Sequence, residues 1–360
     1  MNGPETFAVL RDELAQQLLH HELPVPHPLD ISPWLAMALL QKAIRRGHKV
    51  FALQAAATLL RRSHDAFWRR CGVIAFEDVG VADLDAVSLA VAALAGKIFR
   101  SKVGGEWAVA SFVVERLVKA RKCRSADDLL MLSERHPGYE HLRLGLTYGT
   151  IPELLGIVRS NASMPKRALA LWYAIGSDRC PSPHLRTRKG APQIVFDDLC
   201  ETGHPHTLVE VAREGFRRTG QVLCPLVVLL ASLKPSQPAV IGEDDFPPET
   251  LCGPLPSWAL DVYSREGQQA LRQFVGRDCD TARWVRSHVP PAQRIKFIGN
   301  VLFAAEGGLL QNHYRWPLAD ELRRSWEIEC QGPFCPDATE IISLLRSDIP
   351  LLNEERQHVL

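Results

Sequence analysis

The sequence lacks the features that would assign it to a membrane, secreted or strongly basic class. Its 360 residues carry a formal net charge of only +1, so no overall electrostatic field draws the protein toward nucleic acid. No uninterrupted apolar run approaches the roughly 18 residues of a membrane span, because the segment 222–233 is shorter and contains Pro225. Nine cysteines without Cys-x-x-Cys spacing argue against a secreted disulfide framework. We therefore expect a cytoplasmic protein without membrane contact.

Signatures of common catalytic machinery are also missing. There is no Gly-x-Ser-x-Gly elbow for a nucleophilic serine. There is no Gly-x-x-x-x-Gly-Lys-Ser/Thr loop whose backbone amides would cradle nucleotide phosphates. The nearest match, Ala95-Gly96-Lys97-Ile98, lacks the earlier glycine and the hydroxyl that would hold magnesium. The sequence therefore predicts no catalytic residue and no cofactor, and we expect a protein that is not an enzyme.

Apolar residues recur at three- and four-residue spacing through most of the chain, which predicts a mostly α fold. The predicted parts, in chain order, are an N-terminal helix with a proline-rich connector (1–30), a helical domain (31–136), a helical domain with basic and histidine-containing loops (137–231), a proline-rich, mostly irregular linker (232–258) and a C-terminal helical region (259–360). The only strand-like segments are 194–196 and 222–230, and the second fits a buried helix equally well.

The segment 31–83 is the most informative, because three short helices there end in an acidic turn. The first helix contains Leu40-Gln41-Lys42-Ala43-Ile44-Arg45-Arg46, the second runs from Ala52 to Arg62, and the third leads into Ala75-Phe76-Glu77-Asp78-Val79-Gly80-Val81-Ala82-Asp83. This arrangement resembles the C-terminal, clamp-loader-collar-like region of the MgsA/RarA family of replication-associated recombination AAA+ ATPases, without the ATPase domain. That family has a Lys/Arg-bearing helix, a helix with paired basic residues, and a Ser/Ala-x-Glu-Asp-Ile/Val-Gly-Leu/Val-Ala-Asp turn.

The resemblance implies a collar-like helical bundle over 31–136, which forms a homo-oligomer or binds a partner subunit, followed by a further mainly helical region. It also implies work near single-stranded or branched DNA in replication, repair or recombination. It does not imply ATP hydrolysis, because the residues for it are absent. An alternative from another class is a protein-interaction scaffold of a mobile element or defence system that does not bind DNA.

The acidic turn is interpreted as structural, with Glu77, Asp78, Gly80 and Asp83 as its defining residues. Adjacent side chains on a helix diverge by about 100°, so the two acids cannot form a paired acid/base site. We expect the turn to close one helix and start the next, with the glycine in a left-handed or tight conformation. The carboxylates would bond backbone amides or a nearby arginine such as Arg69 or Arg70.

Basic residues are concentrated between Lys42 and Arg124, where sixteen Lys/Arg accompany seven Asp/Glu. Such an excess is compatible with a phosphate-contacting face. The candidate nucleic-acid-binding residues are Lys42, Arg45, Arg46, Arg61, Arg62, Arg69 and Arg70 on successive helices, and Arg186, Arg188 and Lys189 in a proline-flanked loop. Arginine forks bind phosphate bidentately, with little sequence preference and a steep salt dependence. The alternatives are pairing with acids on neighbouring helices or subunits, and an ordinary solvated loop.

The only cluster with metal-ligand residue types is His204-Pro205-His206, with Asp197, Asp198 and Glu201 nearby. A His-x-His pair shares one face only on a strand. Gly203 and Pro205 indicate a turn there instead, and Thr207 is typical of a helix cap. The sequence therefore predicts no metal-binding residue, and a metal-dependent hydrolase using the two histidines remains a second alternative.

Overall fold

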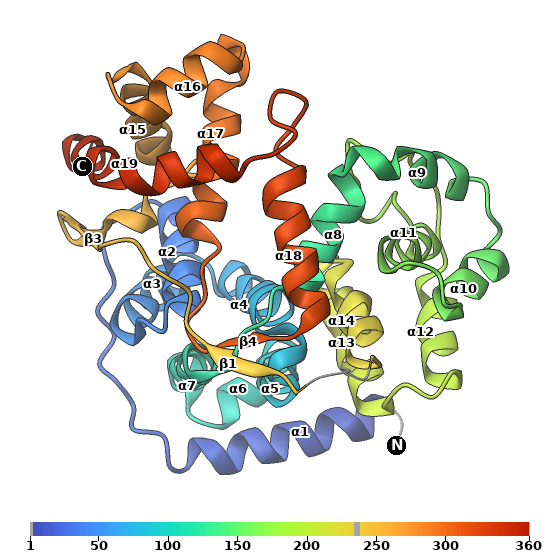
Figure 1. Ribbon diagram of the computed structural model, residues 1–360. Helices are drawn as coiled ribbons and strands as arrows, with labels where there is room; N and C mark the ends of the chain where they lie inside the picture. Colours follow the sequence, from blue (N-terminus) through green and yellow to red (C-terminus); the bar gives the residue numbers. More distant parts are fainter. Residues whose placement is uncertain (1–2, 234–237, 360) are drawn as a thin grey trace.

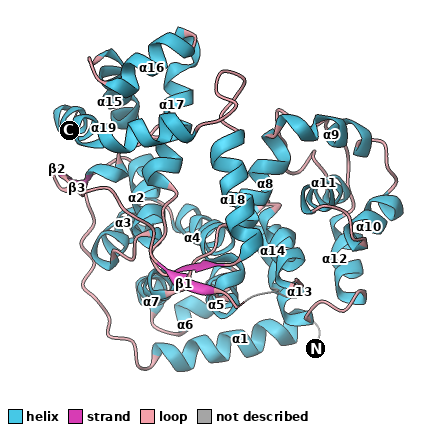
Figure 2. Cartoon of the chain, viewed as in Figure 1, coloured by secondary structure: helices cyan, strands magenta, loops and turns pink. Residues whose placement is uncertain are grey.

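The computed structural model describes residues 3–233 and 238–359, and helices dominate it (Figures 1 and 2). This architecture confirms the mostly α class predicted from apolar spacing. The sheets of the described residues are two antiparallel ribbons, in which β1 (Val240–Gly242) pairs with β4 (His313–Arg315) and β2 (Leu251–Cys252) with β3 (Leu255–Pro256). None of the helices in these two ranges combines the length and the apolar composition that a bilayer crossing requires.

The amino-terminal part of the chain is a bundle of helices in which α5 is buried. These helices are α1 (Gly3–Leu18), α2 (Pro33–Arg45), α3 (Lys49–Arg62), α4 (His64–Ile74), α5 (Leu84–Leu94), α6 (Lys97–Lys102) and α7 (Gly105–Lys119). α1, α4 and α7 pack against α5, while α3 lies between α2 and α7. Buried Ala52, Ala55 and Ala56 give α3 the narrow faces that this close approach needs. The Ser32 side chain accepts from the Leu35 amide at 3.2 Å and so caps α2.

The middle of the chain adds helices to the same core. They are α8 (Ser125–Arg135), α9 (Glu140–Leu146), α10 (Ile151–Arg159), α11 (Met164–Ile175), α12 (Pro192–Glu201), α13 (His206–Thr219) and α14 (Leu223–Ala231). α13 packs on α5 and α11 packs on α8, so one large core runs through both 31–136 and 137–231 without a break at the predicted boundary. The segment 194–196 lies inside α12, so its strand interpretation is wrong. Residues 223–230 lie in the buried α14, which confirms the buried-helix alternative for the segment 222–230.

The carboxyl-terminal helices divide between two cores. They are α15 (Arg265–Gly276), α16 (Asp280–His288), α17 (Arg294–Leu302), α18 (Pro317–Glu329) and α19 (Thr339–His358). α15, α16, α17 and α19 bury a separate, small core of their own. α18 instead packs along α8, where Leu322 and Trp326 join the large core (Figure 1). The predicted region 259–360 is therefore not one packing unit.

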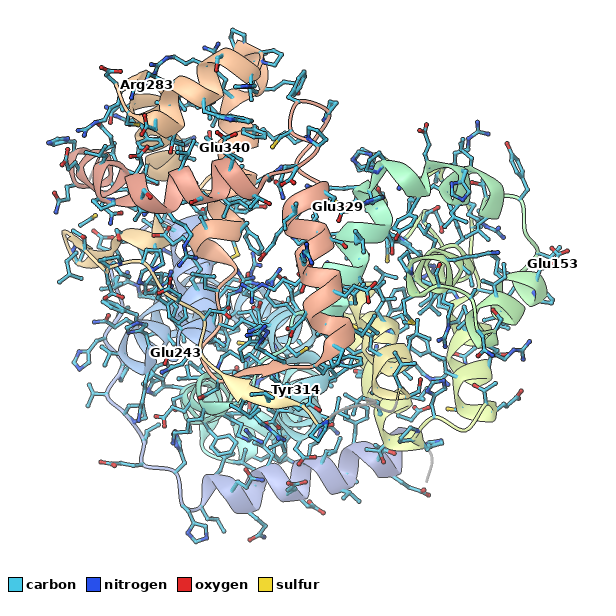
Figure 3. All side chains as sticks on the ribbon, viewed as in Figure 1. Glu153, Glu243, Arg283, Tyr314, Glu329 and Glu340 are labelled. Atoms are coloured by element: carbon cyan, nitrogen blue, oxygen red, sulfur yellow. The ribbon has the colours of Figure 1, made fainter. Side chains whose placement is uncertain are left out.

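The proline-rich linker is more ordered than the sequence predicts. Its residues 234–237 lie outside the described part, but the rest carries β1, β2 and β3. β1 reaches across to β4, on which Figure 3 labels Tyr314. Trp258, at the end of the linker, is 1% exposed and its ring meets Phe51 of α3 edge-on. The linker thus ties the carboxyl-terminal helices to α2 and α3 instead of separating them.

Candidate functional site

The acidic turn joins α4 to α5 through two short helical turns. α4 continues into a π-helical turn, η1 (Ala75–Val79), and then into the 3-10 turn η2 (Gly80–Ala82). Asp83 caps α5 by accepting from the Ala86 amide at 3.0 Å, and its two oxygens also accept from Arg116 at 2.9 Å each. The turn therefore closes one helix and starts the next with its own side chains.

Asp78 is the centre of this turn and is completely buried. One carboxylate oxygen accepts from Arg45 Nε at 2.7 Å and from Arg124 Nη1 at 2.8 Å. The other accepts from Gln41 Nε2 at 3.0 Å. Its backbone carbonyl accepts from the Cys123 amide at 2.9 Å, which fixes the start of α8 against the turn. The bonding arginines are therefore Arg45 and Arg124, not the Arg69 and Arg70 that the sequence suggested.

Arg45 and Arg124 also contact Glu77 and Phe303. They share the Glu77 carboxylate, at 2.8 Å from Arg45 and 3.2 Å from Arg124. They also cover the ring of Phe303, with guanidinium carbons 5.3 and 4.7 Å from its centre. Burial opposes the charge of Arg124, but Asp127, Asp78 and Glu77 together raise its pKa well above the ordinary value. Arg124 therefore stays charged, and the two guanidinium groups hold the turn against Phe303 of the carboxyl-terminal part.

A second acidic turn faces the first. α17 continues into the π-helical turn η6 (Phe303–Gly307), and Glu306 occupies the fourth position there, as Asp78 does in η1. Its two oxygens accept from Arg356 of α19 at 3.0 and 2.6 Å. Burial alone would raise the pKa of Glu306, yet Arg356 beside it brings the pKa below the ordinary value. Arg45 links the two turns by donating to the Gly307 carbonyl at 2.8 Å.

The basic end of α2 is buried between these turns. Lys42 Nζ lies 2.7 Å from the Trp258 carbonyl and 2.6 Å from Asp261. Arg46 donates to the Glu306 carbonyl at 3.0 Å and lies over the Trp258 ring at 5.1 Å. Burial lowers the pKa of Lys42 although the carboxylate of Asp261 opposes the shift. We call the charged groups of the two turns and their basic partners the ionic cluster: Lys42, Arg45, Arg46, Glu77, Asp78, Arg124, Asp127, Asp261, Glu306 and Arg356.

Burial decides which candidate nucleic-acid contacts face solvent. Lys42, Arg45 and Arg46 are only 5%, 3% and 6% exposed and bond protein groups. This placement contradicts a phosphate-contacting role for these three and agrees with the alternative of pairing between helices. Arg70 is half-buried and donates to Gln41 at 3.1 Å. The remaining arginines of the doublets, Arg61, Arg62 and Arg69, are exposed on α3 and α4.

The loop that carries Arg186, Arg188 and Lys189 is only partly exposed to solvent. Arg188 Nη1 donates to the carbonyls of Thr147 and Gly149 at 2.9 and 2.6 Å, so it holds the loop to the end of α9. Arg186 contacts the hydroxyl of the exposed Tyr148. Lys189 is exposed. The structure therefore brings this loop close to α9 and not to the surface arginines of α3 and α4.

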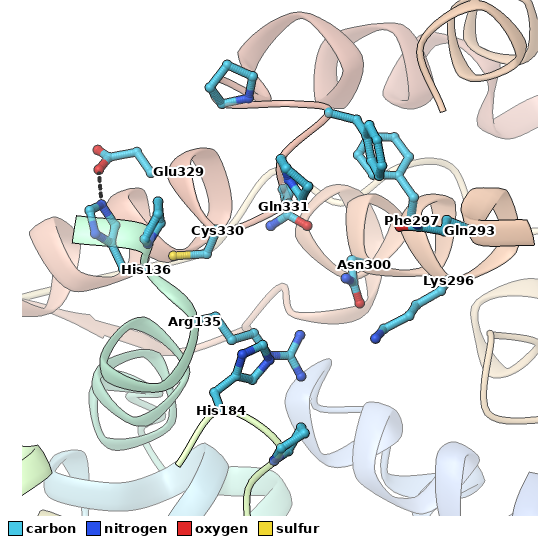
Figure 4. Close-up of a pocket in the computed structure, with 16 residues that line it drawn as sticks. Arg135, His136, His184, Gln293, Lys296, Phe297, Asn300, Glu329, Cys330 and Gln331 are labelled. Atoms are coloured by element: carbon cyan, nitrogen blue, oxygen red, sulfur yellow. Dashed lines mark hydrogen bonds and ion pairs between the residues drawn. The ribbon is translucent and has the colours of Figure 1, made fainter. Parts of the chain in front are cut away.

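A cleft of about 540 Å³ opens where α8, the loop 177–190, α17 and the connection from α18 to α19 meet (Figure 4). Arg135 and His184 lie on one side, and Lys296 and Asn300 on the other, with their polar ends toward the space between in Figure 4. Its volume falls in the usual range for small-ligand sites. No local sequence pattern indicates this cleft, because its walls come from four distant segments.

The cleft offers binding groups and no activated nucleophile. His136 bonds Glu329 at 2.9 Å, and Figure 3 shows Glu329 at the end of α18 beside α8. Arg135 lies over the Trp326 ring at 5.4 Å. Burial raises the pKa of Cys330 to about 12, so its thiol stays protonated at neutral pH. The half-buried Arg135 and the exposed Lys296 beside apolar Phe297 suit an anionic ligand with an apolar body.

The two histidines of the second alternative, a metal-dependent hydrolase, do not converge. His206 lies within 4.8 Å of Cys200 and Glu210, measured between possible ligand atoms. His204 belongs to a different hollow, which Arg159 and Arg167 also line, and its Nδ1 is buried without a hydrogen-bond partner. Asp198 forms an ion pair with Arg159, with 2.9 Å between Oδ1 and Nη1. A His204–His206 metal pair is therefore contradicted by this geometry.

Sequence reasoning missed Arg124, Asp261, Glu306 and Arg356 as members of the ionic cluster. Arg124 precedes Ser125-Ala126-Asp127-Asp128, which reads as a helix start and hides the arginine's role. Glu306 carried a usable signal, because it stands between Ala304-Ala305 and Gly307-Gly308, small residues that leave an acid no polar neighbours. An isolated acid in such a setting indicates a buried charge with a distant partner.

Comparison of the chain with protein-family models, with curated proteins and with solved structures gave no match in any of the three. No relative therefore supplies a function, and the proposed function rests on the residues and their geometry.

Gly80 gives a direct test of how tightly the first turn is built. Its φ is +52°, and a Cβ there would lie 2.7 Å from the Cys123 carbonyl oxygen. We expect Gly80→Ala to lower the free energy of unfolding by roughly 2–4 kcal/mol, from backbone strain plus the clash. Gly220→Ala is the matched control, since Gly220 also has a positive φ (+70°) but open space around it. Urea denaturation of both variants measures the difference, and equal losses would contradict a close contact at Gly80.

Proposed function

We propose that this protein is a non-enzymatic helical scaffold of the DNA replication or repair apparatus. In this proposal 31–136 acts as a clamp-loader-collar-like module that assembles with further copies or with a partner subunit. The observation that carries it is the use of charge around Asp78, where Arg45 and Arg124 are consumed in a buried cross-link. Charged side chains whose hydrogen bonds hold helices together fit a rigid adaptor better than a reaction centre. The resemblance of 31–83 to a collar segment supports the replication or repair setting.

DNA contact, in this proposal, falls to the exposed arginines of one helix pair. Arg61 and Arg62 end α3, and Arg69 lies on α4, which begins directly after Ser63. Their side chains are exposed, and the short connection keeps the two helices side by side. Arginine forks on such a surface contact phosphates without reading bases.

The alternative of a protein-interaction scaffold without DNA binding has its own support. Burial removes Lys42, Arg45 and Arg46 from the set of phosphate contacts, which weakens the case for a DNA surface. The cleft beside Arg135 and Lys296 offers a recognition site of the size of a short partner segment or a small ligand. The two versions differ in one measurable property, affinity for DNA.

Titration of fluorescent single-stranded and forked DNA, followed by anisotropy at two salt concentrations, tests the DNA part. We expect binding that weakens steeply with salt, and a triple variant, Arg61→Ala, Arg62→Ala and Arg69→Ala, that loses about two to three units of salt slope. The matched control removes three exposed arginines elsewhere, Arg179, Arg272 and Arg324, and should bind like the parent.

Two outcomes contradict the proposal in different ways. Absence of binding at low salt would eliminate the DNA part and leave the interaction scaffold. Equal losses of DNA affinity in the triple variant and its control would show that only overall charge matters.

Light scattering tests the assembly part separately. A mass that stays at the 40.1 kDa of one chain at all concentrations would exclude self-association.

A further inference from the structure

Three side chains of different donor type meet at the corner between α12 and α13. Cys200 lies in the last turn of α12, His206 is the first residue of α13, and Glu210 follows one turn later. One ligand atom of each lies within 4.8 Å of the other two. Residues four apart on a helix share a face, which is why His206 and Glu210 both lie on the Cys200 side of α13.

Backbone hydrogen bonds help to hold this corner. The amide of Gly203 donates to the Cys200 carbonyl at 3.3 Å, and the amide of His204 donates to the Leu199 carbonyl at 3.3 Å. Gly203 has a φ of +87°, which reverses the chain so that α13 returns along α12. The donor set is thus presented by a preformed corner, which reduces the ordering cost of binding an ion.

We propose that Cys200, His206 and Glu210 form a binding site for Zn²⁺. Thiolate, imidazole and carboxylate are the donors that zinc takes in proteins, and tetrahedral zinc separates them by roughly 3.3–3.6 Å. Side-chain rotations close the remaining gap from 4.8 Å. His206 is exposed, so the fourth position is open to water. The thiolate disfavours the hard cations Ca²⁺ and Mg²⁺.

One neighbouring cation competes with zinc. Arg213 Nε lies 3.3 Å from a Glu210 oxygen, and its Nη2 donates to Asp197 at 2.9 Å. Zinc would take over Glu210, and Arg213 would keep Asp197. Removal of Arg213 should therefore tighten zinc binding, because it removes a positive charge and frees a ligand. A role of these residues in packing alone would not produce that gain.

Titration of metal-free protein with Zn²⁺ against a chromophoric chelator tests the site. We expect one equivalent to bind, with at least roughly tenfold weaker binding in Cys200→Ser and in His206→Ala. Arg213→Ala should bind more tightly than the parent. Co²⁺ in place of zinc should give a thiolate-to-metal absorption band that Cys200→Ser lacks.

His204→Ala is the matched control, since His204 lies in the same corner but faces the other hollow, and it should bind zinc like the parent. Circular dichroism of the metal-free variants shows whether they fold. If Cys200→Ser does not fold, Glu210→Gln replaces it in the test, because the side chain of Glu210 is partly exposed. Equal zinc affinity in parent and Cys200→Ser, or no stoichiometric binding, would overturn the proposal. Neither outcome bears on DNA binding, which depends on other residues.

Discussion

Replacing Asp78 by alanine is expected to lower the free energy of unfolding by about 3–5 kcal/mol. The carboxylate is fully buried and accepts from Gln41, Arg45 and Arg124. Its removal leaves two guanidinium groups in the interior with only Glu77 and Asp127 to offset them. A domain of ordinary stability has 5–15 kcal/mol in total, so the loss is a large share of it. Urea denaturation followed by circular dichroism measures it.

The control for this prediction is Asp85→Ala. Asp85 lies in the first turn of α5, close to Asp78 in the sequence, and its side chain is exposed. Its removal should therefore lower the free energy of unfolding by about 1 kcal/mol or less.

A second measurement tests whether the loss in Asp78→Ala has an ionic origin. Asp78→Ala combined with Arg124→Met should cost less than the sum of the single losses by about 1–3 kcal/mol, because the orphaned charge leaves with its partner. Strict additivity would contradict an ionic origin.

Local information explains why the fold class and the acidic turn were predictable. Helical periodicity is a property of neighbouring residues, so apolar spacing is enough to place most helices. Asp83, one of the defining residues of the turn, caps α5 with a side chain only three residues from the amide it bonds. None of these inferences needs a contact between distant segments. The expected divergence of the Glu77 and Asp78 side chains is an exception, because both carboxylates accept from Arg124 Nη1.

Long-range contacts explain what was missed. α18 leaves the carboxyl-terminal helices and packs on α8, and no local pattern in 317–329 distinguishes it from its neighbours. Arg45 and Arg61 look alike as members of doublets, yet one is buried and the other exposed. Each doublet stands at the end of its helix and follows buried apolar residues, Ile44 in α2 and Leu60 in α3. The local sequence therefore does not distinguish the two doublets, and the packing of distant segments over the end of α2 decides which one is buried.

The two acidic turns then explain how the two cores are joined. Each turn places an acid at the fourth position of a π-helical turn, Asp78 beside the large core and Glu306 beside the small core. Because π-helical turns widen the backbone and interrupt the regular bonding pattern, they are tolerated where a specific contact repays them. Arg45, the last residue of α2, bonds groups in both turns, and Arg46 directly after it donates to the Glu306 carbonyl. The end of α2 therefore helps to couple the two cores.

Replacing Arg356 by methionine should therefore destabilise the small core first. Arg356 is fully buried on α19, donates to both Glu306 oxygens and donates to the Leu260 carbonyl at 3.1 Å. Its loss leaves a buried carboxylate without its partner, at a cost of about 3–5 kcal/mol. Hydrogen exchange should show lost protection in α15, α16, α17 and α19 while α5 keeps its protection. Uniform loss across both cores would contradict separate units joined by the ionic cluster.

Arg346→Met is the matched control, because Arg346 lies on the same helix but pairs with the exposed Asp245. Such a surface pair contributes about 0–1 kcal/mol.

The pH dependence gives the last test of the Arg356→Met prediction. In the parent, the lowered pKa of Glu306 stabilises the fold above the ordinary glutamate pKa, and that contribution is lost as pH falls. Without Arg356, burial is the dominant influence and raises the pKa of Glu306, so the variant loses stability as pH rises through the ordinary value. The gap in unfolding free energy between parent and variant should shrink from about pH 7 to about pH 4. A gap that is constant over this range would mean that Arg356 does not change the pKa of Glu306. The charge pairing would then not stabilise the contact between α19 and η6.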